Sequence, residues 1–291
     1  MSAARLDLYS ALADEAAALV IRRYSTSFGQ ASRLLAPELR PHIRNVYALV
    51  RVADEVVDGG AAGAGLEPQV AARLLNELER DVERAIEEGY SANLVVHAFA
   101  RTARAAGFGT EAHRALLREH AHGPHPVEHD RESFERYVHG SAEVVGLMCL
   151  RVFLTGAEHP PTPTALAELE AGAQRLGAAF QKVNFLRDLG ADAEELGRRY
   201  LPGLDPAAPT EEAKRVVLDE IDADLAAAAA AIPLLPAGSR RAVAVAHRMF
   251  AELARRIEAT PASALPRTRV RVPDPVKLRI ALATSGRGRH A

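Results

Sequence analysis

Apolar residues recur every three or four positions through most of the chain, which is the spacing of helices with one buried face. Alternating runs typical of strands are nearly absent, and so are Asn-Gly hairpin turns. The pattern therefore predicts an all-α protein. We expect helices at about 5–23, 38–58, 67–88, 92–106, 110–121, 131–155, 163–197, 211–231, 238–259 and 273–284.

Glycine and proline clusters mark the breaks between these helices, at 59–65, 122–126, 159–163 and 201–206. None of them is long enough to serve as a domain linker, and no repeat of fixed period is present. We therefore expect one helical domain over residues 1–291, with a core at about 20–284 and a flexible basic tail at 285–291.

The composition is that of a soluble globular protein, with 48% hydrophobic and 25% charged residues. A formal net charge of -2 gives no reason to expect a nucleic-acid partner. The single cysteine, Cys149, excludes an internal disulfide, and Asp7, Asp14 and Glu15 interrupt the stretch where a signal peptide would need an apolar run. We expect a cytoplasmic location and a monomer.

Two aspartates, Asp54 and Asp58, stand four positions apart in the predicted helix 38–58, so they share one face. Alone, such a pair is more often a solvated helix face than a ligand site. A bound cation would relieve the repulsion, and Mg²⁺ suits this geometry because it takes one or two carboxylates and completes its shell with water and phosphate oxygens.

A second polar stripe lies in the long helix near residue 180, where Gln181, Asn184, Asp188 and Asp192 follow at steps of three and four. The positions between them are mostly apolar, so this helix should be central and its polar side should face a cavity. Two such stripes facing each other would hold several Mg²⁺ ions that bind a diphosphate leaving group.

Five motifs occur in an order that resembles the squalene/phytoene synthase family. They are Y-S-T-S-F (24–28), Y-A-L-V-R-V-A-D-E-V-V-D-G (47–59), Y-V-H-G-S-A-E-V-V-G-L-M (137–148), L-G-A-A-F-Q-K-V-N-F-L-R-D-L-G-A-D (176–192) and R-R-Y-L-P (198–202). The resemblance runs from about residue 20 to 280. It implies an all-α isoprenoid synthase fold, a helical bundle around a central cavity.

The resemblance also implies roles for individual residues. Mg²⁺, with Mn²⁺ as a possible substitute, would be held by Asp54, Asp58, Asn184, Asp188 and Asp192. Tyr137 would act with the four aspartates in catalysis, through cation stabilisation or proton handling; the alternative is an ordinary buried tyrosine. Substrate and diphosphate would contact Ser25, Ser27, Phe28, Tyr47, Arg51, Gln181, Asn184, Arg187 and Lys277.

The implied reaction is head-to-head condensation of two geranylgeranyl diphosphates to phytoene through a cyclopropyl diphosphate, the first committed step of carotenoid biosynthesis, with no need for NADPH. The alternative is a squalene or dehydrosqualene synthase that uses two farnesyl diphosphates, with NADPH for squalene. A rival from another class is a non-catalytic scaffold that binds lipid or assembles other proteins. Loss of aspartates would indicate such a scaffold, and all four are present.

Three positions depart from the family pattern. Ala191 stands where an acidic residue often precedes the last aspartate, Glu143 stands where glycine is common, and Phe250 occupies a tyrosine position. These changes leave both aspartate pairs whole and bear on substrate fit more than on chemistry.

Two further groups of residues admit several interpretations. The histidines between 113 and 129 suggest zinc, but Gly123, Pro124 and Pro126 predict a loop and no cysteine accompanies them. The basic run Arg267, Arg269, Arg271 and Lys277 is a solvated surface, a cap for the diphosphate, or a site of peripheral contact with an anionic membrane.

Overall fold

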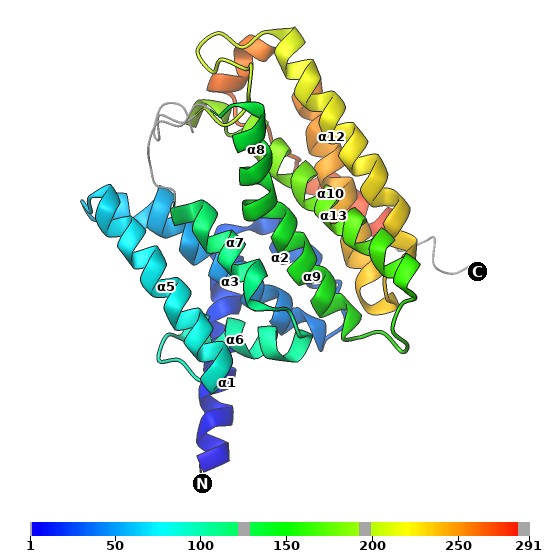
Figure 1. Cartoon of the computed structure of the whole chain (residues 1–291). Helices are drawn as coiled ribbons and strands as arrows, with labels where there is room; N and C mark the ends of the chain where they lie inside the picture. Colours follow the sequence, from blue (N-terminus) through cyan, green and yellow to red (C-terminus); the bar gives the residue numbers. More distant parts are fainter. Residues whose placement is uncertain (1, 122–128, 192–198, 285–291) are drawn as a thin grey trace.

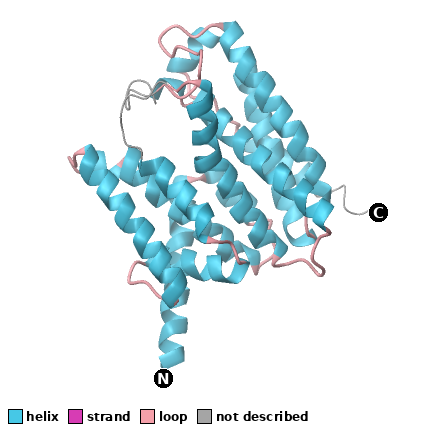
Figure 2. Cartoon of the chain, in the orientation of Figure 1, coloured by secondary structure: helices cyan, strands magenta, loops and turns pink. Residues whose placement is uncertain are grey.

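The computed structural model describes residues 2–121, 129–191 and 199–284, and this part of the chain is a bundle of helices without strands (Figures 1 and 2). The all-α prediction is confirmed. In chain order the helices are α1 (Ser2–Tyr24), α2 (Thr26–Ser32), α3 (Leu39–Asp58), α4 (Gly60–Gly63), α5 (Pro68–Glu88), α6 (Leu94–Ala106), α7 (Thr110–Ala121), α8 (Arg131–Val138), η1 (His139–Glu143), α9 (Val144–Leu154), α10 (Pro163–Arg187), α12 (Glu211–Ala231), η2 (Ile232–Leu234), α13 (Ala237–Glu258), η3 (Ala262–Arg267) and α14 (Asp274–Ala283).

Most predicted helix boundaries agree with the structure to within three residues, but the helix expected over 163–197 is interrupted. It is interrupted after Arg187, because Asp188 leaves the helical conformation with φ −101° and ψ 11°, and residues 192–197 of the predicted range lie outside the described part. The helix expected over 131–155 is present over Arg131–Leu154 and contains a π-helical turn, His139–Glu143, between α8 and α9. The sequence pattern predicted neither of the short helices α2 and α4. α2 is rich in residues with low helix propensity, and α4 is too short to show a periodicity.

Helix ends follow local capping chemistry. Asn93 accepts hydrogen bonds from the first amides of α6, and Gly107 ends that helix in a left-handed conformation with φ 67°. Thr162 and Thr210 cap the first turns of α10 and α12 in the same manner. These contacts satisfy amide groups that a helix cannot pair internally.

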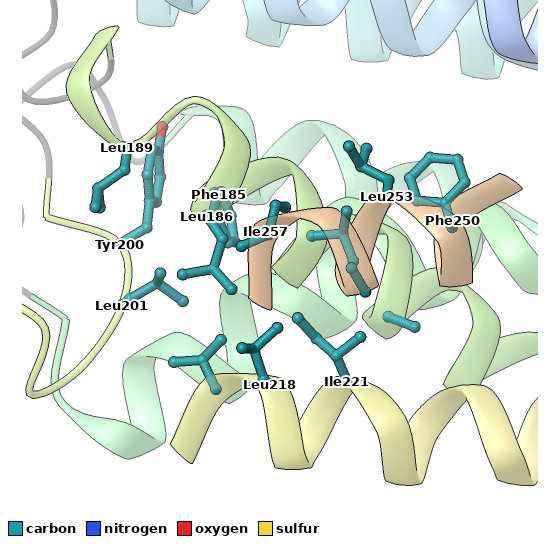
Figure 3. Close-up of a cluster of buried hydrophobic side chains, with 14 of the residues drawn as sticks. Phe185, Leu186, Leu189, Tyr200, Leu201, Leu218, Ile221, Phe250, Leu253 and Ile257 are labelled. Atoms are coloured by element: carbon teal, nitrogen blue, oxygen red, sulfur yellow. The ribbon is translucent and has the colours of Figure 1, made fainter. Parts of the chain in front are cut away.

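Two large apolar clusters form the interior. One joins α10, α12 and α13 and contains Leu186, Ile221 and Ile257, all fully buried (Figure 3). The other joins the helices of the N-terminal half with α9 and includes Phe99 and Met148. The two clusters lie on neighbouring helices, because α9 and α10 pack against each other.

Charged side chains cross-link α10 to α12 within the bundle. The Nζ of Lys182 lies 2.9 Å from a carboxylate oxygen of Asp224 and 2.9 Å from one of Glu220, and Arg175 also pairs with Asp224 at 3.0 Å. Lys182 and Asp224 are both buried, and each keeps a second partner in the network, Glu220 for Lys182 and Arg175 for Asp224. This network attaches α10, the helix that carries the second polar stripe, to α12.

By length and apolar composition, one described stretch, Arg131–Leu154, could cross a membrane, and 39% of its most apolar window is buried in the structure. It comprises α8, η1 and α9, which pack against α7 and α10. Core helices of soluble proteins have the same composition.

His113 on α7 is fully buried, and neither ring nitrogen has a hydrogen-bond partner. Its Nε2 lies 4.0 Å from the Glu83 carboxylate, and its ring meets Phe99 edge-on. Burial lowers the pKa of His113 from 6.5 to about 4, the principal cause being the loss of solvation of the charged form. The folded protein therefore keeps this imidazole neutral.

This shift predicts a loss of stability in mild acid. Between pH 6.5 and pH 4 the unfolded chain binds a proton at His113 that the folded chain does not, so the free energy of unfolding falls as the pH is lowered. From pH 7 to pH 5 we expect a loss of about 2 kcal/mol from this group. Urea unfolding of wild type and His113→Leu at both pH values measures it as the difference between the two proteins; equal pH dependence would contradict the assignment.

Candidate functional site

The first aspartate motif occupies the last turns of α3. Asp54 and Asp58 both belong to this helix, as predicted, and α3 ends at Asp58. The Asp54 carboxylate is partly exposed and lies 3.9 Å from Nη1 of Arg51, one turn earlier. The side chain of Asp58, like that of Ser27, lies outside the described part of the structure.

Arg51 is surrounded by contacts that the sequence prediction did not include. Its Nη2 donates to the Glu55 carboxylate, and the ring of Tyr24 lies against the guanidinium, 4.3 Å from Cζ to the ring centroid. The other Glu55 oxygen accepts from the backbone amide of Gly60 at 3.0 Å. The hydrogen bond from Arg51 is the principal cause of a lowered pKa at Glu55, so this carboxylate is charged.

The segment between α1 and α2 brings the N-terminal motif to α3. Ser25 caps α2 by accepting from the Phe28 amide at 3.1 Å, and it lies close enough to Tyr47 of α3 to act on the pKa of that side chain. Burial raises the pKa of Tyr47, with the positive charge of Arg51 acting in the opposite direction. Ser25, Tyr47 and Arg51 thus belong to one neighbourhood, as the family pattern implied.

Aromatic rings from three helices converge on Phe28. Its centroid lies 6.2 Å from that of Tyr47, 5.7 Å from Phe180 of α10 and 5.6 Å from Phe250 of α13. Phe180 and Phe250 stack at 3.7 Å. This group, called the Phe28 cluster below, joins α3 to α10 through α2 and forms an apolar wall between the two motif helices.

The second motif lies at the C-terminal end of α10. Gln181 and Asn184 are half-buried on that helix, beside buried Lys182 and Phe185, and Asp188 follows directly after its last residue. Asp188 is contacted by two arginines, Nε of Arg187 at 3.1 Å and Nε of Arg269 at 3.0 Å. Asp192, the last predicted carboxylate, lies outside the described residues.

Arg269 reaches Asp188 because the C-terminal segment crosses the end of α10. A side chain at Gly190 would place its Cβ 1.8 Å from the carbonyl oxygen of Pro266, so only glycine permits this crossing. The basic run predicted from the sequence is thereby divided. Arg269 meets the second motif, whereas Lys277, predicted to bind diphosphate, pairs with Asp274 of its own helix at 3.0 Å.

Tyr137 of α8 lies in a second aromatic group rather than in the Phe28 cluster. Its ring centroid lies 6.0 Å from Phe185, 5.3 Å from Tyr200 and 5.3 Å from His129. Phe180 and Phe185 both belong to α10, so this helix connects the two groups. The catalytic role of Tyr137 stays a prediction.

The three departures from the family pattern have distinct surroundings. Glu143 pairs with Nδ1 of His139 at 2.8 Å across the π-helical turn. Phe250 is buried in the Phe28 cluster, where its ring stacks on Phe180. Ala191 is exposed beyond the end of α10. None of them alters Asp54 or Asp188.

The two motif helices have the same orientation. In Figure 1, α3 and α10 both run toward the upper left of the view, so their aspartate ends point to the same side of the molecule. Within the described residues no group of three or more His, Cys, Asp or Glu side chains converges as a metal site, and this count includes neither Asp58 nor Asp192. The histidine stretch for which zinc was considered is described only in part, because residues 122–128 lie outside the described residues.

The donor set at both helix ends has the chemistry of a Mg²⁺ and diphosphate site. Asp54 and Asp188 offer partly exposed carboxylates and Asn184 an amide oxygen, which are ligands that Mg²⁺ prefers. Arg51, Arg187 and Arg269 stand among them and match phosphate oxygens. A separate pocket of about 340 Å³ lies between α1 and α6, lined by Ser10, Asp14, His97 and Arg101 among others, and involves none of these residues.

Comparison with known proteins agrees with these motifs. The model of the squalene/phytoene synthase family matches residues 21–275. A 15-cis-phytoene synthase from Paracoccus sp. is 29% identical over 254 residues, covering 81% of this chain and 79% of its own. A phytoene synthase from Rhodobacter capsulatus is 30% identical over 252 residues, covering 80% of this chain and 70% of its own.

The fold has a close counterpart among solved structures. A dehydrosqualene synthase crystallised with a ligand superimposes with a TM-score of 0.78 at 21% identity and covers 96% of this chain and 97% of its own. The family match spans all of the motifs and nearly all of the helices described above. The chain therefore belongs to the squalene/phytoene synthase family of prenyltransferases, and it has that family's isoprenoid synthase fold.

Proposed function

We propose that this protein condenses two geranylgeranyl diphosphates head to head, through a cyclopropyl diphosphate, to phytoene, the first committed step of carotenoid biosynthesis. The observation that carries the proposal is the alternation of carboxylates and guanidinium groups at the ends of α3 and α10, beside an aromatic wall. Diphosphate and its metal ions need both kinds of group. The names of the sequence relatives support the twenty-carbon substrate.

Asp54, Asp58, Asn184, Asp188 and Asp192 would hold the metal, and bound Mg²⁺ would supply the positive charge that stabilises a departing diphosphate. Arg51, Arg187 and Arg269 would donate to phosphate oxygens and orient the leaving group. Gln181 would add an amide beside them, and the hydroxyls of Ser25 and Ser27 would contact the same diphosphate. Lys277 pairs with Asp274, so we assign the C-terminal diphosphate contact to Arg269 instead.

The hydrocarbon chemistry requires protection from water. Departure of the first diphosphate leaves an allylic cation, which the double bond of the second substrate attacks, and proton loss closes the cyclopropane. The second diphosphate then departs, the two C1 carbons join, and a further proton is lost. Tyr47 and the rings around Phe28 would exclude water and offer π-faces to the cation, an interaction worth about 2 kcal/mol when desolvated. Tyr137 is the candidate for proton handling.

The substrate assignment is tested by product analysis. Purified protein is incubated with Mg²⁺ and either geranylgeranyl or farnesyl diphosphate, with and without NADPH, and the hydrocarbon is identified by mass. We expect phytoene from the twenty-carbon substrate without NADPH. A thirty-carbon product would transfer the same mechanism to squalene or dehydrosqualene synthesis, and no product from either substrate would favour the scaffold.

The aspartate assignment predicts that Asp54→Asn and Asp188→Asn lose activity while they stay folded. Each change removes one negative charge but keeps the side-chain shape, so we expect turnover to fall by about 100-fold or more. Both carboxylates are partly exposed and their arginine pairs contribute about 1 kcal/mol at most, so the melting temperature should change little. Asp219→Asn, at an exposed position of α12, is the control. Near-normal turnover in either variant would refute the metal site.

The proposal includes peripheral contact of this cytoplasmic enzyme with an anionic membrane, because substrate and product are both apolar. Leu278 and Leu282 lie one turn apart on α14 with 61% and 63% of their surface exposed. Arg271 and Arg279 are exposed beside them. Apolar insertion combined with basic side chains is the usual basis of interfacial binding.

Sedimentation with vesicles measures this contact. We expect binding to vesicles that contain anionic lipid, and a decrease of about 30-fold in Leu278→Ser/Leu282→Ser, since each of the two leucines contributes about 1 kcal/mol on partial insertion. The matched control is Leu8→Ser/Leu12→Ser, because these leucines of α1 are 73% and 49% exposed but stand among Asp7, Asp14 and Glu15. Equal loss in both variants would contradict a specific role for α14.

A further inference from the structure

Glu55 is the charged residue of the first motif to which the proposed mechanism gives no task. It lies between Asp54 and Asp58 on α3 and is partly buried, with 29% of its side chain exposed. A carboxylate placed there only for solubility would extend into water. Glu55 instead uses each of its two oxygens on a different partner.

One oxygen of Glu55 holds the guanidinium of Arg51. Nη2 of Arg51 donates to Oε1, and the Tyr24 ring covers one face of the same guanidinium at 4.3 Å. Nη1 stays 3.9 Å from Asp54, which is beyond hydrogen-bond reach, and Nε has no hydrogen-bond partner. The guanidinium of Arg51 is therefore fixed at one edge and one face, while its Nη1 and Nε make no hydrogen bond.

The second oxygen of Glu55 holds the turn that follows Asp58. Oε2 accepts from the Gly60 amide at 3.0 Å. A Cβ on Gly59 would lie 2.7 Å from this oxygen, so the absence of a side chain there allows the carboxylate to approach the backbone. Gly59 is the residue directly after Asp58, and α3 ends at that point. Glu55 thus connects the turn after one candidate metal ligand to the candidate diphosphate arginine.

Fixing these groups in advance lowers the cost of binding. A free arginine side chain samples many rotamers, and part of this freedom is lost whenever it orders around a ligand. In this structure Glu55 and Tyr24 order Arg51 before substrate arrives. The negative charge of Glu55 could instead weaken diphosphate binding, since it neutralises Arg51 and competes with an incoming phosphate. These two effects predict opposite outcomes when the charge is removed.

We infer that Glu55 is a positioning residue for the diphosphate, which it serves by orienting Arg51 and by anchoring the Gly59–Gly60 turn beside Asp58. The inference rests on the proposed function insofar as the ligand is a diphosphate. It assigns Glu55 neither a metal nor a contact with the substrate.

The test compares wild type with Glu55→Gln and Glu55→Asp. Glutamine keeps the side-chain length but weakens the hold on Arg51, whereas aspartate keeps the charge but shortens the reach by one methylene. Calorimetry measures the binding of inorganic pyrophosphate in the presence of Mg²⁺, which requires no turnover. We expect Glu55→Gln to bind about tenfold more weakly than wild type and Glu55→Asp to recover part of the difference.

A matched control separates positioning from general stability. Glu170 of α10 also pairs its carboxylate with an arginine, Arg151, at 2.7 Å, and has a similar exposure of 34%. Glu170→Gln should bind Mg²⁺ and pyrophosphate as wild type does. If Glu55→Gln melts early, the Tyr24→Leu variant tests the same idea, because it removes the other contact that fixes Arg51 from an exposed position.

Steady-state kinetics supplies the second readout. With prenyl diphosphate we expect the KM of Glu55→Gln to rise more than its kcat falls, since binding of the diphosphate is affected before the chemistry. Unchanged or tighter pyrophosphate binding in Glu55→Gln would overturn the inference and identify Glu55 as a competitor or a purely structural group.

The two proposals fail in different ways. Wild type that binds pyrophosphate with Mg²⁺ but converts neither prenyl diphosphate would refute the proposed function and leave the role of Glu55 standing. Wild type that turns over while Glu55→Gln behaves identically would refute the inference alone. Wild type that binds no pyrophosphate would overturn both.

Discussion

Pairing between carboxylates and arginines at the ends of α3 and α10 is the interaction on which the candidate site depends. Asp54 lies near Arg51, and Asp188 lies between Arg187 and Arg269. A guanidinium that faces a carboxylate balances its charge and donates hydrogen bonds to it. Arginine is suited to this task because its charge persists at any physiological pH and its planar fork donates to several acceptors at once. The same groups can then serve a diphosphate.

The aromatic rings between the motif helices serve the fold and the proposed chemistry together. Phe28 belongs to a short helix that has little stability of its own, and its contacts with Tyr47, Phe180 and Phe250 attach that helix to the bundle. Those contacts also place apolar surface beside the charged helix ends. A phenylalanine at position 250 takes part in this packing through its stacked ring.

The helical periodicity was sufficient to predict the fold class and most helix boundaries, because both depend on contacts between residues three or four positions apart. The break after Arg187 could not be predicted in this way, since the apolar pattern continues through Leu189, and neither could the close approach of Pro266 to Gly190. The sequence pattern also could not predict that Tyr137 lies in an aromatic group with His129 and Tyr200. These features depend on segments that are distant in sequence.

The two aspartate motifs differ in whether their contacts come from neighbouring or from distant positions in the sequence. Asp54 and Glu55 stand three and four positions after Arg51 on one helix, so the contacts of both with Arg51 could have been expected from spacing alone.

Asp188 instead meets an arginine more than eighty positions later, through a crossing that glycine at position 190 permits. The first motif can therefore take shape with its own helix, whereas the second is complete only after the C-terminal segment has packed across α10. Because such distant contacts form late and at higher entropic cost, the second motif should be the less independent half of the site.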